Sequence, residues 1–169
     1  MKKVFQAGLI LFLLFSIVSC GQTANVDTEL QVTEQIFEGI SFNRPVDWTV
    51  TTEEAESNSI LIKSNSTYHN HSVLVVSLIS GIDMTAMDYA KSVFEGLENA
   101  SNPKEMKFGD LSFPMVTITQ NTTTYNFFFS SGPDIYFFTY ANMENRIEKE
   151  LEDILASLKI NQVLDTPVP

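Results

Sequence analysis

Apolar and polar residues alternate along much of the chain after residue 36, and this period of two predicts a protein built mainly of strands. The run from Val73 to Val76 has no polar alternation, which is typical of a strand buried on both faces. Pro45 lacks the N–H of a ladder hydrogen bond, so we expect the first strand to end or bend there. The predicted strands cover residues 37–43, 48–52, 60–63, 72–80, 106–108, 112–120, 123–130 and 135–140.

Two stretches, residues 86–97 and 147–158, carry apolar residues at the spacing of a helix. Thr85 precedes the first of them, and Asp88 three residues later fits a capping box. We expect Asn142 to cap the second helix, because its short polar side chain suits the first position outside a helix.

Aromatic residues concentrate in the last two predicted strands, which form a hairpin around residues 131–134. Neighbouring residues of a strand point to opposite faces, so both faces of the sheet need cover. The pattern predicts an α+β fold: a single-domain α/β/α sandwich with a mostly antiparallel sheet of about six or seven strands flanked by helices. The aromatic residues are Tyr125, Phe127, Phe128, Phe129, Tyr136, Phe137, Phe138 and Tyr140.

The first twenty residues predict export. Lys2 and Lys3 precede an uncharged apolar run over residues 8–18, which is short for about 30 Å of hydrocarbon but suits a signal-peptide core. The run ends in Ile17-Val18-Ser19-Cys20-Gly21, which resembles the lipobox of bacterial lipoproteins. The resemblance implies that Cys20 carries lipid and becomes the mature N-terminus. The alternatives are a cleaved secretory signal with an incidental cysteine, and a retained transmembrane anchor.

These patterns divide the chain into a lipoprotein signal peptide at 1–19, a lipidated cysteine with a flexible tether at 20–34, a folded domain at 35–160 and a loose tail at 161–169. As a flexible coil, the tether spans roughly 20 Å. We therefore expect a protein anchored to a membrane by lipid on its extracytoplasmic side. Gly21 does not settle whether that membrane is the outer or the inner one.

Charge narrows the possible partners. The chain has 10 basic and 21 acidic residues, and loss of the two signal-peptide lysines leaves 8 against 21, a net charge of −13. Such a domain is a poor partner for nucleic acid or anionic lipid head groups. The hydrophobic share of 44% excludes an intrinsically disordered chain, and the single cysteine excludes a disulfide framework within the chain.

Three local features resemble the PsbP-like family. Residues 40–48 are close to the family's aromatic-x-x-Pro-x-x-Trp opening, a helix follows the fourth strand, and residues 154–160 are similar to the closing helix, with Leu158 in place of the usual aromatic. That fold is shared by an extrinsic subunit of photosystem II, a Ran-binding nuclear import factor and bacterial DcrB-like proteins. The family has no common catalytic residues, and its better-known members bind or scaffold other proteins. The resemblance therefore implies that this protein also binds or scaffolds other proteins.

Few residues suggest chemistry. Pro45 and Trp48 form a candidate structural motif that shapes a bend and fills the core, with a Trp48 kept exposed for a ligand as the alternative. His69 and His71 would share a strand face and could hold a metal, but their polar surroundings favour a solvated loop. We therefore expect no metal, no cofactor and no catalytic residue.

Acidic residues recur at helical spacing near the end of the chain, and we expect them to form a solvated face, with a weak cation site or a basic partner as the alternative. Arg146 is expected to offset part of the repulsion by pairing with Glu150. The acidic segment 53–56 is interpreted in the same way. The acidic residues at helical spacing, which form the predicted acidic stripe, are Glu144, Glu148 and Glu152.

The sequence thus favours a non-catalytic binding or assembly module of the bacterial cell envelope, with an unidentified envelope protein as its partner. One alternative is a carrier of a small apolar ligand, whose aromatic strands would line a pocket. A less favoured one is a carboxylate-based hydrolase, which needs two carboxylates about 5 to 10 Å apart in a cleft. No dinucleotide-binding, phosphate-loop or nucleophile-elbow motif occurs in the sequence.

Overall fold

The computed structural model describes residues 31–52, 58–65 and 71–161. The predicted signal peptide, Cys20, most of the predicted tether, His69 and residues 162–169 lie outside the described residues. None of the helices in the described part is long and apolar enough to cross a membrane.

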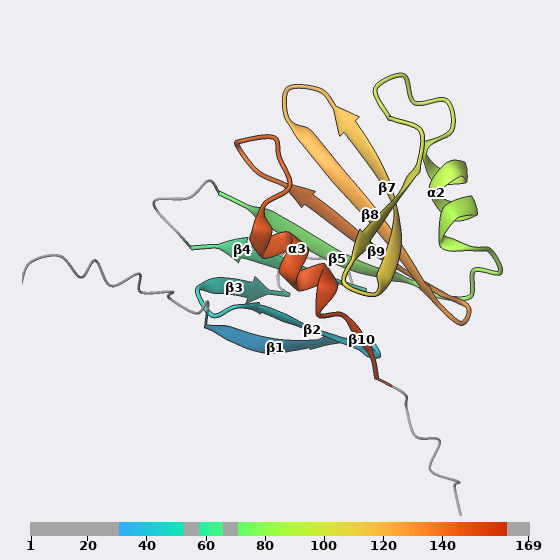
Figure 1. Cartoon of the computed structure of the whole chain (residues 1–169). Helices are drawn as coiled ribbons and strands as arrows, with labels where there is room; N and C mark the ends of the chain where they lie inside the picture. Colours follow the sequence, from blue (N-terminus) through green and yellow to red (C-terminus); the bar gives the residue numbers. More distant parts are fainter. Residues whose placement is uncertain (1–30, 53–57, 66–70, 162–169) are drawn as a thin grey trace, which may run out of the picture. The chain divides into compact units, whose positions relative to one another are not determined.

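Seven strands form the larger sheet, in the order β3-β4-β5-β9-β8-β7-β6, and every neighbouring pair is antiparallel (Figure 1). The long central strands β8 and β9 are those with the aromatic run. The strands are β3 (Trp48–Thr51), β4 (Ser59–Ser64), β5 (Val73–Ile79), β6 (Lys104–Phe108), β7 (Leu111–Thr119), β8 (Thr123–Ser131) and β9 (Asp134–Ala141).

In the described part of the chain there are two helices, α2 (Ala86–Phe94) and α3 (Lys149–Ala156), and they cover opposite faces of this sheet. Phe127 and Phe128 are neighbours on β8, so their side chains point to opposite faces. Phe127 packs in the cluster that includes α3, whereas Phe128 packs in the cluster that includes α2. The predicted α+β class with a mostly antiparallel sheet between helices is therefore confirmed.

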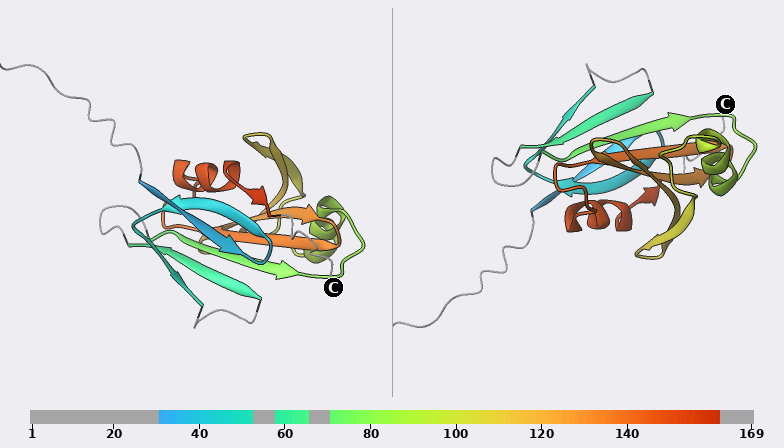
Figure 2. Two further views of the ribbon diagram at one scale, coloured as in Figure 1. Left: turned by 90° about the horizontal axis from the view of Figure 1, so that it is seen from below. Right: turned by 90° about the horizontal axis from the view of Figure 1, so that it is seen from above.

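A second sheet of three strands joins the beginning and the end of the domain, and the sequence did not predict it. It contains β1 (Val32–Phe37), β2 (Ile40–Pro45) and β10 (Lys159–Ile160), in the order β1-β2-β10. The backbone N–H of Asn43 on β2 donates to Ser157 Oγ at the end of α3, so this sheet lies beside α3 (Figure 2).

The strand predicted over residues 37–43 is wrong, because a tight turn divides that stretch into β1 and β2. Glu38 and Gly39 have φ values of 42° and 85°, the positive pair that a two-residue hairpin turn needs. β1 also begins at Val32, inside the segment predicted to be tether. Pro45 is the last residue of β2, as its missing N–H led us to expect.

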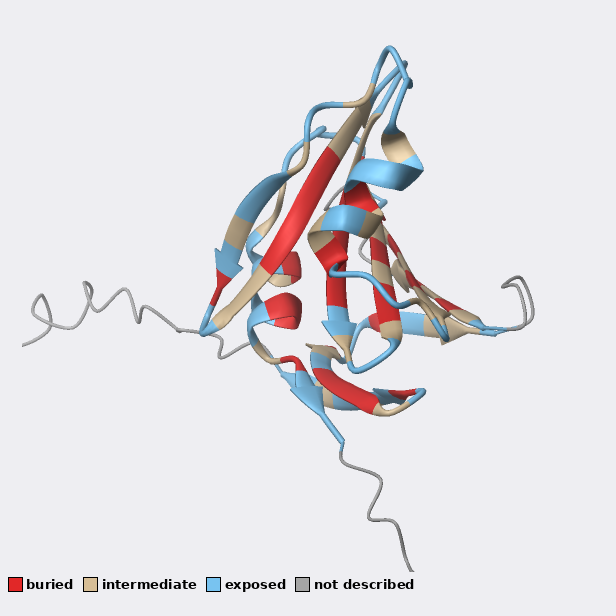
Figure 3. Ribbon diagram, turned by 90° about the vertical axis from the view of Figure 1, so that its right-hand side faces the viewer, coloured by how far each residue is buried: buried red, intermediate tan, exposed pale blue. Residues whose placement is uncertain are grey.

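The core consists of two packed clusters of buried side chains, one on each face of the larger sheet. The aromatic rings contact each other directly: the centroids of Phe128 and Phe137 lie 4.8 Å apart under α2, and those of Phe108 and Phe127 lie 5.6 Å apart under α3. Trp48 is only 4% exposed and belongs to the cluster with α3. Figure 3, with α2 toward the viewer, shows buried residues in the middle of the strands behind that helix.

Candidate functional site

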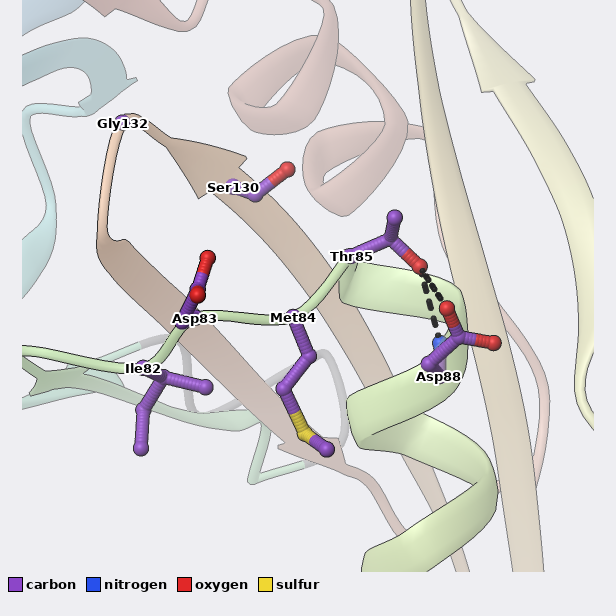
Figure 4. A pocket seen from close by; sticks show the side chains of 7 residues that line it. All are labelled: Ile82, Asp83, Met84, Thr85, Asp88, Ser130 and Gly132. Carbon is purple, nitrogen blue, oxygen red and sulfur yellow. Dashed lines mark hydrogen bonds between the residues drawn. The ribbon is translucent and has the colours of Figure 1, made fainter.

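An open pocket of about 680 Å³ lies where the chain passes from β5 to α2, beside the turn between β8 and β9 (Figure 4). The backbone N–H of Ile82 donates to Pro133 O at 2.8 Å and ties the two segments together. The residues that line the pocket are Ile82, Asp83, Met84, Thr85, Asp88, Ser130 and Gly132.

The capping box predicted for this helix forms one wall of the pocket. Thr85 is the N-cap of α2: its Oγ1 accepts from the backbone N–H of Asp88 at 3.1 Å and donates to Asp88 Oδ2 at 2.8 Å. Lys91 Nζ lies 3.6 Å from Asp88 Oδ1. Asp88 is therefore occupied by the helix itself, which leaves Asp83 as the free carboxylate of the pocket among the described residues.

The chemistry of this pocket suits a cation or a basic side chain more than catalysis. Asp83 and Asp88 are both exposed, and solvent surrounds their carboxylates. A carboxylate hydrolase needs a general acid in a desolvated environment, and neither residue has one. Ile82 and Met84 are its larger apolar residues, and no aromatic side chain lines it.

A buried polar cluster lies at the other helix and was not found from the sequence. Glu148 Oε2 accepts from Tyr140 Oη and from Ser72 Oγ, each at 2.9 Å, and Asn142 Nδ2 donates to Tyr140 Oη at 3.0 Å. Burial, followed by the nearby Glu148 carboxylate, raises the pKa of the Tyr140 phenol far above its ordinary value of 10.0. Ser72 and Tyr140 are at most 1% exposed, whereas Glu148 is half-buried, so the cluster ties the residue before α3 to the buried hydroxyls of the sheet.

This cluster corrects two predictions. Asn142 does not cap the final helix: its side chain bonds the backbone N–H and carbonyl of Arg146 and so closes the loop before α3. The N-cap is Glu148, which leaves Glu144 outside the helix, so the predicted acidic stripe does not form. Arg146 pairs with Glu144 at 2.5 Å rather than with Glu150.

The other residues that the sequence suggested for metal or cation binding do not form a site among the described residues. His71 is exposed, and residues 53–56 lie outside the described residues. Among the described residues, no group of three or more His, Cys, Asp or Glu side chains could hold a metal ion. Pro45 is buried at the end of β2, and the guanidinium of Arg44 donates to the backbone carbonyls of both Pro45 and Trp48, which joins the two members of the predicted motif.

The outer edge of β1 is the second surface feature of note. Among the described residues β1 pairs only with β2, so its other side is a free edge within that part of the chain. Val32 is 49% exposed and Ile36 is 63% exposed, and both share one face of the strand with the exposed Glu34. Exposed apolar residues on a strand with one free edge are a feature that monomeric proteins usually avoid.

Comparison with known proteins extends only to the fold. No protein-family model and no curated protein sequence matches the chain. A crystal structure from Bacteroides thetaiotaomicron is similar with a TM-score of 0.60 and 18% identity, over 79% of this chain and 50% of that one. The chain therefore spans about half the length of that relative. The solution structure of cyanobacterial PsbP from Synechocystis is similar with a TM-score of 0.49 and 13% identity, over 86% of this chain and 99% of that one.

Proposed function

We propose that the chain is a lipid-anchored, extracytoplasmic binding or assembly module of the bacterial cell envelope, without catalytic activity. The anchor and the location rest on the lipobox-like residues that end at Cys20. The observation that carries the binding role is the free edge of β1, where exposed Val32 and Ile36 lie beside unpaired backbone. Strand edges of this kind are where other proteins add to a sheet.

The packing of the aromatic strands supports this function over a carrier of apolar ligands. A carrier needs an apolar cavity that encloses most of its ligand. Here Phe127, Phe128 and Phe138 are fully buried against helices and other rings. The aromatic residues thus fill the core, and the pocket beside α2 is open and acidic instead.

The test is crosslinking and affinity capture from native membranes with four tagged chains. Wild type should recover a protein partner, and Cys20→Ala should recover much less because the domain is no longer held at the membrane. Ile36→Lys should also lose the partner. Leu97→Lys is the matched control, because Leu97 is an exposed residue on the α2 side of the domain, 51% exposed against 63% for Ile36.

Two results would contradict the proposal. One is that wild type captures nothing beyond the unanchored Cys20→Ala chain. The other is that mass spectrometry of the purified wild type finds a bound small apolar molecule at stoichiometric amounts, which would favour the carrier.

A further inference from the structure

The hydrogen-bond pattern of the small sheet determines which backbone groups of β1 face outward. Paired residues of an antiparallel ladder alternate between bonded and non-bonded pairs. The N–H of Val46 donates to Gln31 O at 3.0 Å, which makes this pair a bonded one. With the register Val32 opposite Pro45, the N–H and C=O groups of Val32, Glu34 and Ile36 therefore point away from β2.

Most of these outward groups have no partner among the described residues. The exception is the carbonyl of Ile36, which accepts from Nε2 of Gln35 at 2.9 Å. Val32, Glu34 and Ile36 also present their side chains on one exposed face. The β1 edge thus combines free backbone N–H and C=O groups with a row of three exposed side chains, in which the acidic Glu34 lies between the apolar Val32 and Ile36.

We propose that the β1 edge binds an extended segment of a partner protein, which adds as a further strand with apolar residues opposite Val32 and Ile36 and a Lys or Arg opposite Glu34. This inference rests on the proposed function and names its partner class. Main-chain bonds would supply affinity, and the alternating side chains would supply specificity. The basic residue follows from charge: it meets Glu34 on a chain whose net charge is −11.

A second copy of the chain fits this edge poorly. If two β1 strands pair antiparallel with the twofold axis at Glu34, the register that brings Val32 opposite Ile36 of the other copy also places Glu34 opposite Glu34. Like charges directly opposite each other destabilise a strand pair. Both copies also carry the same negative net charge.

The two edges of the larger sheet differ from β1 in the way that protected edges do. β6 presents the exposed charges of Lys104, Glu105 and Lys107, which oppose strand addition. On β3, the carbonyl of Trp48 accepts from Arg44 and the Thr49 hydroxyl accepts from Asn65. β1 carries one exposed charge, Glu34, against three on β6, and no side chain of the described residues bonds the backbone carbonyls of Val32 and Glu34.

The test uses the full-length lipoprotein in detergent and two peptides, Thr-Val-Thr-Lys-Thr-Val-Thr and the same sequence with Glu in place of Lys. Affinity is measured by fluorescence anisotropy, and amide exchange is measured by NMR. The lysine peptide should bind about fivefold more tightly, in line with one cross-strand ion pair. It should slow exchange at Val32, Glu34 and Ile36, and leave Thr33 and Gln35 unchanged because β2 already protects them.

Two variants of Glu34 separate the edge from the fold. Glu34→Pro removes an outward N–H without removing a β1–β2 bond, and should weaken peptide binding about tenfold. Its matched control is Glu105→Pro on the β6 edge, which should leave binding unchanged. If Glu34→Pro does not fold, Glu34→Lys keeps the backbone intact and should reverse the preference, so that the glutamate peptide binds more tightly.

Equal affinity for the two peptides, or binding that leaves exchange along β1 unchanged, would overturn the inference. A chain that is dimeric and already protects the β1 amides without peptide would assign the edge to a second copy and overturn it too. Failure of the proposed function is distinct: membrane capture would recover no partner. If membrane capture recovers a protein partner but neither peptide binds, the proposed function is supported and the inference about the β1 edge is wrong.

Discussion

At the scale of single residues, the turn between β1 and β2 depends on Gly39. Its φ is 85°, and a Cβ there would lie 3.3 Å from Tyr136 Oη, which donates to the carbonyl of Glu38 at 2.5 Å. Gly39→Ala should therefore lower the free energy of unfolding by about 2 kcal/mol, from backbone strain and displacement of the hydroxyl. Gly132→Ala is the control, because Gly132 also has positive φ but no atom within 4 Å. Urea denaturation compares the two, and equal losses would show that the Tyr136 contact contributes nothing.

The hydroxyl of Tyr140 makes a second prediction at this scale, in the dependence of stability on pH. Burial and then the Glu148 carboxylate raise the pKa of Tyr140 above its ordinary 10.0, so the folded chain keeps a proton that the unfolded chain releases. Stability from this group is complete below pH 10.0 and falls as the pH rises above it. Denaturation midpoints at about pH 9 and about pH 11 should differ less in Tyr140→Phe than in wild type. An equal difference in the two chains would mean that Tyr140 ionises normally.

At the scale of elements, the start of α3 depends on Glu148, which accepts two hydrogen bonds from buried hydroxyls. Glu148→Ala should cost about 2 kcal/mol, because the hydroxyls of Ser72 and Tyr140 lose that acceptor. Glu144→Ala removes only a surface ion pair with Arg146 and should cost about 0.5 kcal/mol or less. Thermal unfolding followed by circular dichroism distinguishes them, and similar midpoints would contradict the role given to Glu148.

Helix α2 offers a prediction that the sequence alone supports. Thr85 satisfies the N–H of Asp88 at the first turn, so Thr85→Ala should destabilise the domain by about 1 kcal/mol. Ser92→Ala is the control, because the Ser92 hydroxyl donates only to Tyr89 O within the helix. Equal unfolding midpoints for the two variants would show that the Thr85 cap does not contribute to the stability of the domain.

These elements also show why some of the structure could be predicted and some could not. The N-cap at Thr85 and the hairpin strands of the aromatic run are local patterns, and the structure confirms them. The cap at Glu148 is not local: it depends on Ser72, far away in the sequence. The turn at Glu38 was missed because glutamate rarely adopts positive φ, and here a contact from Tyr136 in another sheet holds it.

At the scale of the whole molecule, the proposed function has two parts, a lipid anchor and a binding surface. The proposed anchor depends on Cys20, which lies outside the described residues, and it makes a simple prediction. Cells given labelled palmitate should label the wild-type chain, which should fractionate with membranes. Cys20→Ala should take up no label and leave the membrane fraction, because one thiol is the only attachment point in the sequence. Label in Cys20→Ala would contradict the assignment.

The proposed binding role depends on the free β1 edge, which no local pattern of the sequence indicates. Its detection required the register between β1 and β2, because only the register separates outward from inward backbone groups. β1 begins 12 residues after Cys20 in the sequence.

The most direct measurement is hydrogen exchange with mass spectrometry on residues 32–37, made on the chain in native membranes and on the purified chain. The account predicts slower exchange of this segment in the membranes, where a partner strand covers the edge, and no such change along β6. The same exchange rate of residues 32–37 in both samples would contradict the claim that the chain works by binding a partner through β1.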